Sequence, residues 1–154
     1  MRRAPARFAC ADKGISQYMP AKRDMPSTIQ RSGKKAQETW GKTHDSAVEQ
    51  YGEGERAHRT AFSSLKHTHE KVGDHWEPKA GGRKGPSDAQ AAKKGARARN
   101  SKTPTAEGVD ANATKTHLME VARRLEIPGR SSMNKGELVE AIKKANRKAT
   151  SKAR

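Results

Sequence analysis

The chain of 154 residues contains few of the side chains that build a large protein core. Only 31% of its residues are hydrophobic and 4% are aromatic, whereas 32% are charged. A chain of this composition has too little apolar surface to fold throughout, so we expect part of it to remain unfolded in water. Its length allows one ordinary domain or two very small ones.

Long apolar runs and cysteines are also scarce. The longest apolar run, residues 8–11, has four residues, whereas a membrane-spanning helix needs roughly 20. No apolar segment of about 7–15 residues follows the basic start of the chain, so we predict no secretory signal peptide. The single cysteine, Cys10, cannot form an intrachain disulfide and is interpreted as an incidental thiol. These absences favour a protein of the reducing cytoplasm.

Positive charge, by contrast, is in large excess, with a formal net charge of +16. A chain with this charge attracts polyanions whatever its fold, so nucleic acid is the expected partner and an anionic membrane surface is the rival. The net charge is +3 over residues 1–18, +2 over 19–79, +5 over 80–115 and +6 over 116–154. This asymmetry indicates a nearly neutral folded unit attached to a basic arm.

Residues 19–79 have the pattern of a small helical unit. Apolar residues recur at helical spacing from Lys34 to Tyr51, and Gly52 is suited to end that helix. A second helix is predicted to begin near Glu55, where the helix dipole favours acidic side chains. The stretch "DMPSTIQRS" predicts a short helix, because Pro26 suits an early helical position. The segments "YMPAKR" and "GDHWEPK" look extended and could pair as two short strands.

Three stretches of this unit are "MPAKRDMPSTIQRSGKKAQETW", "HDSAVEQYGEGERAHRTAFSSLKHTHEK" and "WEPK". They resemble the ChaB family over nearly all of residues 19–79. The resemblance implies three helices packed on a small sheet, and a chain that begins at Met19. Residues 1–18 are therefore expected to be a disordered leader and, if translation starts at Met19, no part of the native protein.

The resemblance to ChaB also implies two roles. The family name comes from a proposed link to a cation antiporter, which implies a cation-transport accessory protein. Proteins of similar layout are described as plasmid-stabilisation proteins, which implies a role on DNA. No stretch of this sequence has the character of a transport element, so the residues themselves do not decide between the two roles.

The same unit contains five of the six histidines. His67 and His69 are two residues apart on a predicted helix, so they face different sides and cannot easily share a metal ion. No pair of a nucleophile and a base can be singled out. We therefore expect no metal, no cofactor, no small-molecule substrate and no enzymatic activity. Trp40, Phe62 and Trp76 are expected in the core, and stacking on nucleic-acid bases is the alternative.

Residues 80–113 are rich in Gly, Ala, Ser, Pro and basic side chains. Such a segment cannot offset the entropy of ordering, so we predict a disordered, cationic linker. Its stretch "GGRKGPS" lacks the spacing G-x-x-x-x-G-K-[ST] of a phosphate loop, and no apolar strand precedes it. Diffuse contacts with nucleic acid are expected from the basic side chains of Arg83, Lys84, Lys93, Lys94, Arg97 and Arg99.

Residues 114–147 predict a second, smaller unit of two helices joined by an extended corner. The first helix is expected over residues 114–126, with Pro128 ending it because the residue before a proline avoids the helical region. The second is expected to be capped by Asn134 or Ser132, and residues 148–154 are expected to form a basic tail. A unit of fewer than roughly 40 residues should be only marginally stable alone.

The stretch "LMEVARRLEIPGRSSMNKGELVEAI" resembles the N-terminal helical module of Rho termination factor, which is itself similar to SAP-type helix–extended-loop–helix DNA binders. The resemblance implies nucleic-acid binding, in plasmid or nucleoid maintenance or in transcription termination. It also implies a miniature core formed by Leu118, Ala122, Leu125, Ile127, Met133, Leu138 and Ile142.

The predicted binding surface centres on the start of the second helix. Free N–H groups of a helix start, together with hydroxyl and basic side chains, form a natural phosphate site. We therefore assign Arg130, Ser131, Ser132 and Lys135 to phosphate contacts. The surrounding positive field is assigned to Arg123, Arg124, Lys143, Lys144 and Arg147.

The sequence thus predicts a mainly α, non-enzymatic protein that binds nucleic acid on the cytoplasmic nucleoid. DNA is favoured over RNA, with weak sequence preference because no base-reading element is evident. Residues 19–79 are expected to bind a protein partner. The alternative is a protein-interaction regulator, such as a cation-transport accessory protein, whose helical hairpin docks on another protein.

Overall fold

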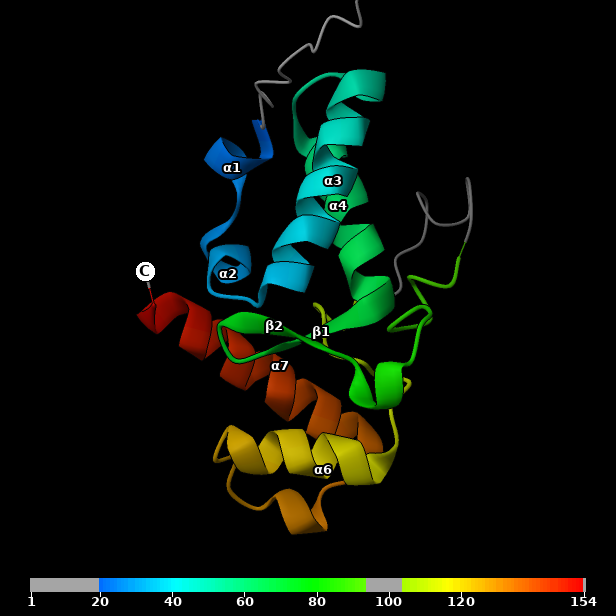
Figure 1. Ribbon diagram of the computed structural model, residues 1–154. Coiled ribbons are helices and arrows are strands. Elements are labelled where there is room, and N and C mark those ends of the chain that lie inside the picture. The colour runs from blue at the N-terminus through cyan, green and yellow to red at the C-terminus, as the bar shows by residue number, and fades with distance from the viewer. Residues whose placement is uncertain (1–19, 94–103, 154) are drawn as a thin grey trace, which may run out of the picture.

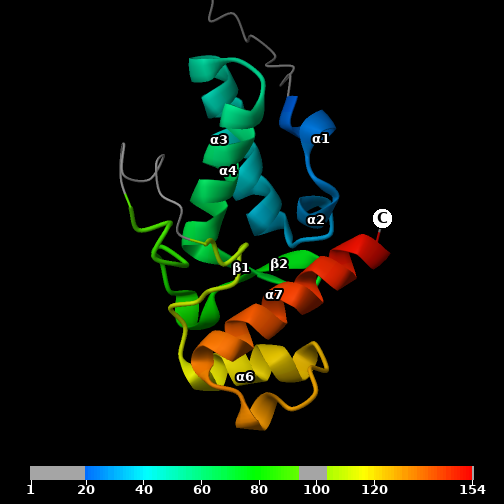
Figure 2. The same ribbon diagram turned by 180° about the vertical axis from the view of Figure 1, so that it is seen from behind.

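The computed structural model describes residues 20–93 and 104–153. The leader, residues 1–18, lies outside the described residues, and the expectation about it stays untested. The described part is mainly α-helical with one small sheet, as predicted (Figures 1 and 2). In chain order its elements are α1 (Pro20–Asp24), α2 (Ser27–Gln30), α3 (Lys34–Tyr51), α4 (Glu55–Thr68), β1 (His69–Val72), β2 (His75–Pro78), η1 (Ala80–Gly82), α6 (Lys115–Arg124), η2 (Arg130–Ser132) and α7 (Lys135–Lys152).

Helices α3 and α4 form a helical hairpin above the sheet (Figure 1). On α4, Ala57, Ala61 and Leu65 are buried at intervals of four, which places them on one face. That face meets the buried residues of α3, among them Trp40, which is 0% exposed. The two helices predicted here are confirmed, because the spacing of their apolar residues is a local signal that the packing then uses.

The sheet consists of β1 and β2 alone among the described residues, paired antiparallel from His69↔Pro78 to Val72↔His75. Gly73 takes a φ of 67° in the two-residue loop between the strands, a conformation that such tight hairpin loops favour. Ser32 Oγ accepts a hydrogen bond from the Trp76 N–H over 2.8 Å, which fixes β2 against the end of α2. Trp76 is buried, as expected of a core residue.

The prediction of an extended strand in "YMPAKR" was wrong. Residues 20–24 form α1, and the Ala21 N–H donates to Asp45 Oδ1 of α3 over 3.0 Å. Ala21 also lies against Gly41, where an added Cβ would stand 3.6 Å from the Ala21 Cβ. The hydrogen bond from Ala21 to Asp45 and this approach to Gly41 hold α1 on α3, and β2 takes its partner from the segment directly before it.

The C-terminal module, residues 113–153, has the predicted helix–corner–helix form. The corner containing η2 runs back beneath α6, so α7 starts near the start of α6 and the two helices run in the same general direction (Figures 1 and 2). The predicted miniature core is confirmed: five of its seven members are buried and two, Leu125 and Met133, pack on it while partly buried. The fully buried members are Leu118, Ala122, Ile127, Leu138 and Ile142.

The C-terminal module packs directly against the strand hairpin. Val72 of β1 belongs to the same apolar cluster as the core of the C-terminal module. Asn146 of α7, which is 3% exposed, accepts from the Gly73 N–H over 2.7 Å and donates to the Lys71 carbonyl over 2.8 Å. Helix α7 also continues to Lys152, so most of the expected basic tail is helical.

The expectation of a disordered linker is wrong at both described flanks. Asp88 joins them: its carboxylate accepts from the N–H groups of Ala91 over 2.6 Å and Ala106 over 2.7 Å. Val109 is 2% exposed and enters the core of the C-terminal module. Hydrogen bonds to one buried carboxylate thus order residues that carry little apolar surface. Lys94, Arg97 and Arg99 lie outside the described residues.

Candidate nucleic-acid interface

The corner between α6 and α7 is closed by its own hydrogen bonds. Gly129 takes a φ of 69°, the left-handed conformation that glycine adopts without steric cost. The Arg130 Nη1 group donates to the Ile127 carbonyl over 3.2 Å, and Ser132 Oγ donates to the Gly129 carbonyl over 2.9 Å. Ser131 is exposed. Of the predicted phosphate contacts, Arg130 and Ser132 therefore also stabilise the corner.

The start of α7 is a complete capping box. Asn134 Oδ1 accepts from the Glu137 N–H over 3.0 Å, and Glu137 Oε2 accepts from the Asn134 N–H over 2.7 Å. The N–H groups of Lys135 and Gly136 lie in the first turn and have no acceptor within the helix. An anion can approach these two donors beside the exposed Lys135, but the Glu137 carboxylate occupies the same helix end and weakens the local positive field.

The last two residues of α6 lie at the opposite end of the C-terminal module from this helix start (Figure 1). Arg124 forms an ion pair with Glu77 of β2. The hydrogen bond from Arg124 holds the pKa of the Glu77 carboxyl below its ordinary value, against the effect of burial. Arg123 is exposed and has no ion pair within residues 20–93 and 104–153. Arg124 therefore faces the hairpin, and Arg123 faces solvent.

The remaining predicted residues lie along α7. Lys143 is 7% exposed and its Nζ stands 2.8 Å from Glu140 Oε1. Arg147 pairs with both carboxylate oxygens of Glu107. Lys144, between them in sequence, is exposed and unpaired in the part of the chain that the structure describes. The ion pairs of Lys143 and Arg147 reduce the positive charge that these residues offer to a ligand, whereas the charge of Lys144 is not offset by a paired acid.

The structure does not gather the nine predicted residues into one patch. The corner patch consists of Arg130, Ser131, Ser132 and Lys135. The helix patch consists of Lys143, Lys144 and Arg147, to which the exposed Lys148 is adjacent. Nine residues separate Lys135 from Lys144, which is about 13 Å along α7 and roughly half a turn around it. The two patches therefore suit separate phosphates.

Several residues of the seam between the C-terminal module and the hairpin were not foreseen from the sequence. His117 Nε2 lies 2.6 Å from Glu70 Oε1, and burial raises the pKa of the Glu70 carboxyl while His117 opposes that rise. Lys79 Nζ donates to the Gly85 carbonyl over 2.8 Å and lies 3.9 Å from Asp110 Oδ1. The partners in both charged pairs, His117–Glu70 and Lys79–Asp110, are far apart in sequence, and no local pattern marks them.

Within residues 20–93 and 104–153, no group of three or more His, Cys, Asp or Glu side chains is placed to hold a metal ion. Over the same residues, no helix combines the length and the apolar composition needed to cross a membrane.

Two segments of the chain match known families. Residues 25–79 match the model of the ChaB family, and residues 113–150 match that of the Rho termination factor, N-terminal domain. Both resemblances found in the sequence are thus confirmed, over nearly the segments that carried them. No curated protein and no solved structure matches the chain. The two matches meet in the structure at the seam between the hairpin and the C-terminal module.

Proposed function

We propose that this chain binds nucleic acid, with DNA as the favoured partner, and carries out no reaction on it. The observation that carries the proposal is the distribution of cations on a segment similar to the Rho termination factor, N-terminal domain. Lys135, Lys144 and Lys148 are exposed and have no ion pair among the described residues. Exposed cations of this kind release condensed counterions when they meet phosphates, which favours binding.

The corner patch and the helix patch would each take phosphates of the backbone. At the corner patch, Lys135 and Ser131 offer a charge and a hydroxyl beside two free N–H groups of α7. At the helix patch, Lys144 makes the direct contact. Arg147 and Lys143 add to the field, and a phosphate can replace Glu107 as the partner of Arg147, because both are anions that bind a guanidinium through two oxygens.

Recognition of this kind is weakly dependent on sequence. Phosphate contacts position a protein on a duplex, whereas sequence is read at the base edges in the grooves. The two patches consist of lysines, arginines and serines, and the side chain of the adjacent Asn134 is engaged in the capping box of α7. We therefore propose a role in organising or maintaining DNA on the cytoplasmic nucleoid.

A second candidate function rests on the match of residues 25–79 to ChaB. That match suggests regulation of cation transport through a protein partner of the N-terminal unit. Tyr51 is the exposed large hydrophobic residue of the described chain, at 47%, and the Arg56 guanidinium lies 3.7 Å from the centre of its ring. A partner of this unit would accordingly meet a polar surface.

The test uses the full chain, because the core of the C-terminal module includes Val72 of the hairpin. The affinity for a labelled 30-base-pair duplex is measured by fluorescence anisotropy across a salt series. The logarithm of the binding constant should fall with the logarithm of the salt concentration with a slope of about −5, as about six neutralised phosphates require. The variant Lys135→Gln/Lys144→Gln should weaken binding to unrelated duplexes equally and make the slope shallower by about 2.

The matched control is Lys42→Gln, which removes an exposed lysine of α3 and should leave duplex affinity nearly unchanged. A double variant that binds like wild type would refute the assigned surface. Absence of duplex binding near physiological salt, with binding to anionic liposomes instead, would favour the second candidate function.

A further inference from the structure

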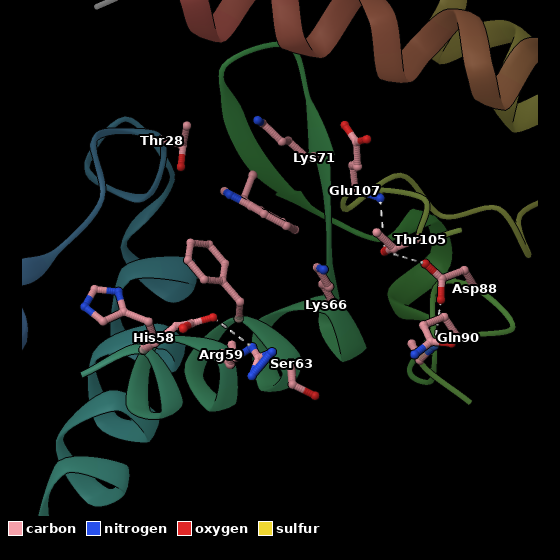
Figure 3. A pocket seen from close by; sticks show the side chains of 14 residues that line it. Thr28, His58, Arg59, Ser63, Lys66, Lys71, Asp88, Gln90, Thr105 and Glu107 are labelled. Carbon is pink, nitrogen blue, oxygen red and sulfur yellow. Dashed lines mark hydrogen bonds and ion pairs between the residues drawn. The ribbon is translucent and has the colours of Figure 1, made fainter. Parts of the chain in front are cut away.

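A cavity of about 530 Å³ lies beside the N-terminal unit, and Glu107 at its edge pairs with Arg147 of the helix patch. Its wall is formed by α4, the strand hairpin, residue 28 of α2 and residues 88–91 and 105–107 (Figure 3). No residue of α6, η2 or α7 lines it. The volume falls in the range of about 300–1,000 Å³ that is usual for small-molecule sites.

Two lysines line this cavity and form no ion pair within the described residues. Lys66 comes from α4 and Lys71 from β1, on different walls (Figure 3). Both are half-buried, and neither has an ion pair or side-chain hydrogen bond within residues 20–93 and 104–153. Burial lowers the pKa of the Lys71 ammonium below its ordinary value. Holding an ammonium partly out of water without a partner costs free energy that a bound anion would offset.

The acids of the cavity are already engaged. Glu107 receives two hydrogen bonds from Arg147 of α7. Asp88 accepts the N–H groups of Ala91 and Ala106 and the hydroxyl of Thr105. These bonds hold the pKa of the Asp88 carboxyl below its ordinary value, although burial acts in the other direction. Glu55, the third acid of the lining, pairs with Arg59. Glu107 attracts Lys71 and Asp88 attracts Lys66, but no acid of the cavity forms an ion pair or hydrogen bond with either lysine.

An aromatic surface adjoins the lysines. Phe62 is partly buried, and its ring lies 5.9 Å from that of Trp76, tilted by 40°. Both side chains line the cavity, together with the hydroxyl-bearing Thr28. Trp76 is buried and Gly108 lies close against its indole, where an added Cβ would stand 2.6 Å from the ring, so packing restricts the position of the indole. A flat ring can lie on such a surface while an attached anion reaches the lysines.

We propose that this cavity binds a nucleotide, with its base against Phe62 and its phosphate between Lys66 and Lys71. A phosphate supplies the direct ion-pair partner that the two ammonium groups lack, and a base supplies the ring that the aromatic wall accepts. The nucleotide is either a free mononucleotide or an unpaired nucleotide of a strand, since both present this chemistry. The site goes beyond the proposed phosphate contacts of the C-terminal module and does not depend on them.

The test is calorimetric titration of the full chain with adenosine 5′-monophosphate, adenosine and inorganic phosphate. The mononucleotide should bind saturably and more tightly than either part. The variant Lys66→Met/Lys71→Met keeps the apolar stems and should weaken binding by about tenfold or more, because each hydrogen bond between charged groups carries about that factor. Lys42→Met is the matched control and should bind like wild type.

A second variant, Phe62→Leu, should reduce the preference for the mononucleotide over inorganic phosphate. Equal binding of phosphate and mononucleotide, or unchanged affinity in the double-lysine variant, would overturn the proposal, as would the absence of saturable binding. Circular dichroism spectra that match wild type show that each variant is folded.

Two further arms separate the sources of the nucleotide. A short single-stranded oligonucleotide that competes with the mononucleotide supports a strand as the source, and absence of competition supports the free nucleotide. Duplex binding by the same proteins separates this proposal from the proposed function. The double-lysine variant should keep wild-type duplex affinity, whereas Lys135→Gln/Lys144→Gln should keep wild-type affinity for the mononucleotide.

Discussion

Replacing Asn146 by alanine should destabilise the entire described fold. The side chain is 3% exposed and joins α7 to the strand hairpin through two hydrogen bonds, one from the Gly73 N–H and one to the Lys71 carbonyl. Alanine leaves both backbone groups buried without a partner. Each such group costs about 1–3 kcal/mol, so the free energy of unfolding should fall by about 2–5 kcal/mol. Domains are usually stable by only about 5–15 kcal/mol, so this loss is large.

The assay is urea unfolding followed by two probes. Tryptophan fluorescence reports on Trp40 and Trp76 in the N-terminal unit, whereas far-ultraviolet circular dichroism reports on all helices. In the wild type the two transitions should coincide, because the hairpin belongs to both apolar clusters through Val72 and Trp76. In Asn146→Ala both midpoints should move to lower urea, and the transitions should begin to separate.

The control is Asn112→Ala. Asn112 is exposed, and its Nδ2 group donates to the Pro86 carbonyl over 2.8 Å. Water can replace that bond, so the change should cost less than about 1 kcal/mol. A loss in Asn146→Ala as small as that in the control would refute the view that the asparagine fastens the C-terminal module to the hairpin.

Three other substitutions test separate features. Gly108→Ala should lower the free energy of unfolding, measured by thermal unfolding, by at least about 2 kcal/mol, because the added Cβ would stand 2.6 Å from Trp76 at a φ of 97°. The control, Gly81→Ala, places its Cβ in open space and should lower it by only about 1 kcal/mol. The pKa of the Asp88 carboxyl is lowered in the fold, so its stabilising effect is present above about pH 4 and is lost as the pH falls below that value. In urea titrations, Asp88→Asn should therefore be less stable than wild type at pH 6 and should approach wild type at pH 3. A difference in the free energy of unfolding that stays constant with pH would contradict this. Glu137→Gln removes the acid at the start of α7, so anisotropy at low salt should show duplex binding tightened by roughly two- to fivefold, and unchanged or weaker binding would count against the corner patch.

The helices and the core of the C-terminal module could be predicted because their signals are local. The buried residues of α4 recur every four positions, and those of the C-terminal module follow a helical stripe interrupted at Pro128. The partner of β2 could not be predicted in the same way. Strand β2 pairs with the residues directly after α4, whereas α1 is held on α3 by the hydrogen bond from Ala21 to Asp45, which are 24 positions apart, so no local pattern marks that contact.

The flanks of the expected linker show a different limit. Their composition is polar and small, which predicts disorder when apolar burial is the only gain considered. The structure orders them through Asp88, whose carboxylate accepts bonds from residues up to 18 positions away, and through Gly108, which fits against Trp76. Neither feature produces a periodic pattern in the sequence. One is a buried carboxylate that accepts three hydrogen bonds, and the other is a glycine packed against a tryptophan.

The same limit applies to the candidate interface. The sequence indicates which residues are basic, but only the fold determines which of them are neutralised. Arg124 pairs with an acid 47 residues away and Arg147 with one 40 residues away. Lys143 pairs within its own helix, three residues from Glu140, a relation that the sequence does allow.

These pairings give the C-terminal module two electrostatic sides. Arg124, His117 and Arg147 meet Glu77, Glu70 and Glu107, and all three acids belong to the hairpin or the segment packed on it. Lys144 and Lys148 lie about half a turn of α7 from Asn146, which contacts the hairpin, and no acid of the described chain pairs with them. In the proposed binding mode a polyanion would therefore be attracted to this side of α7. In the proposed binding mode, Glu77 of the nearly neutral N-terminal unit would influence binding without contact, because it pairs with Arg124 on the side of the C-terminal module that faces the hairpin.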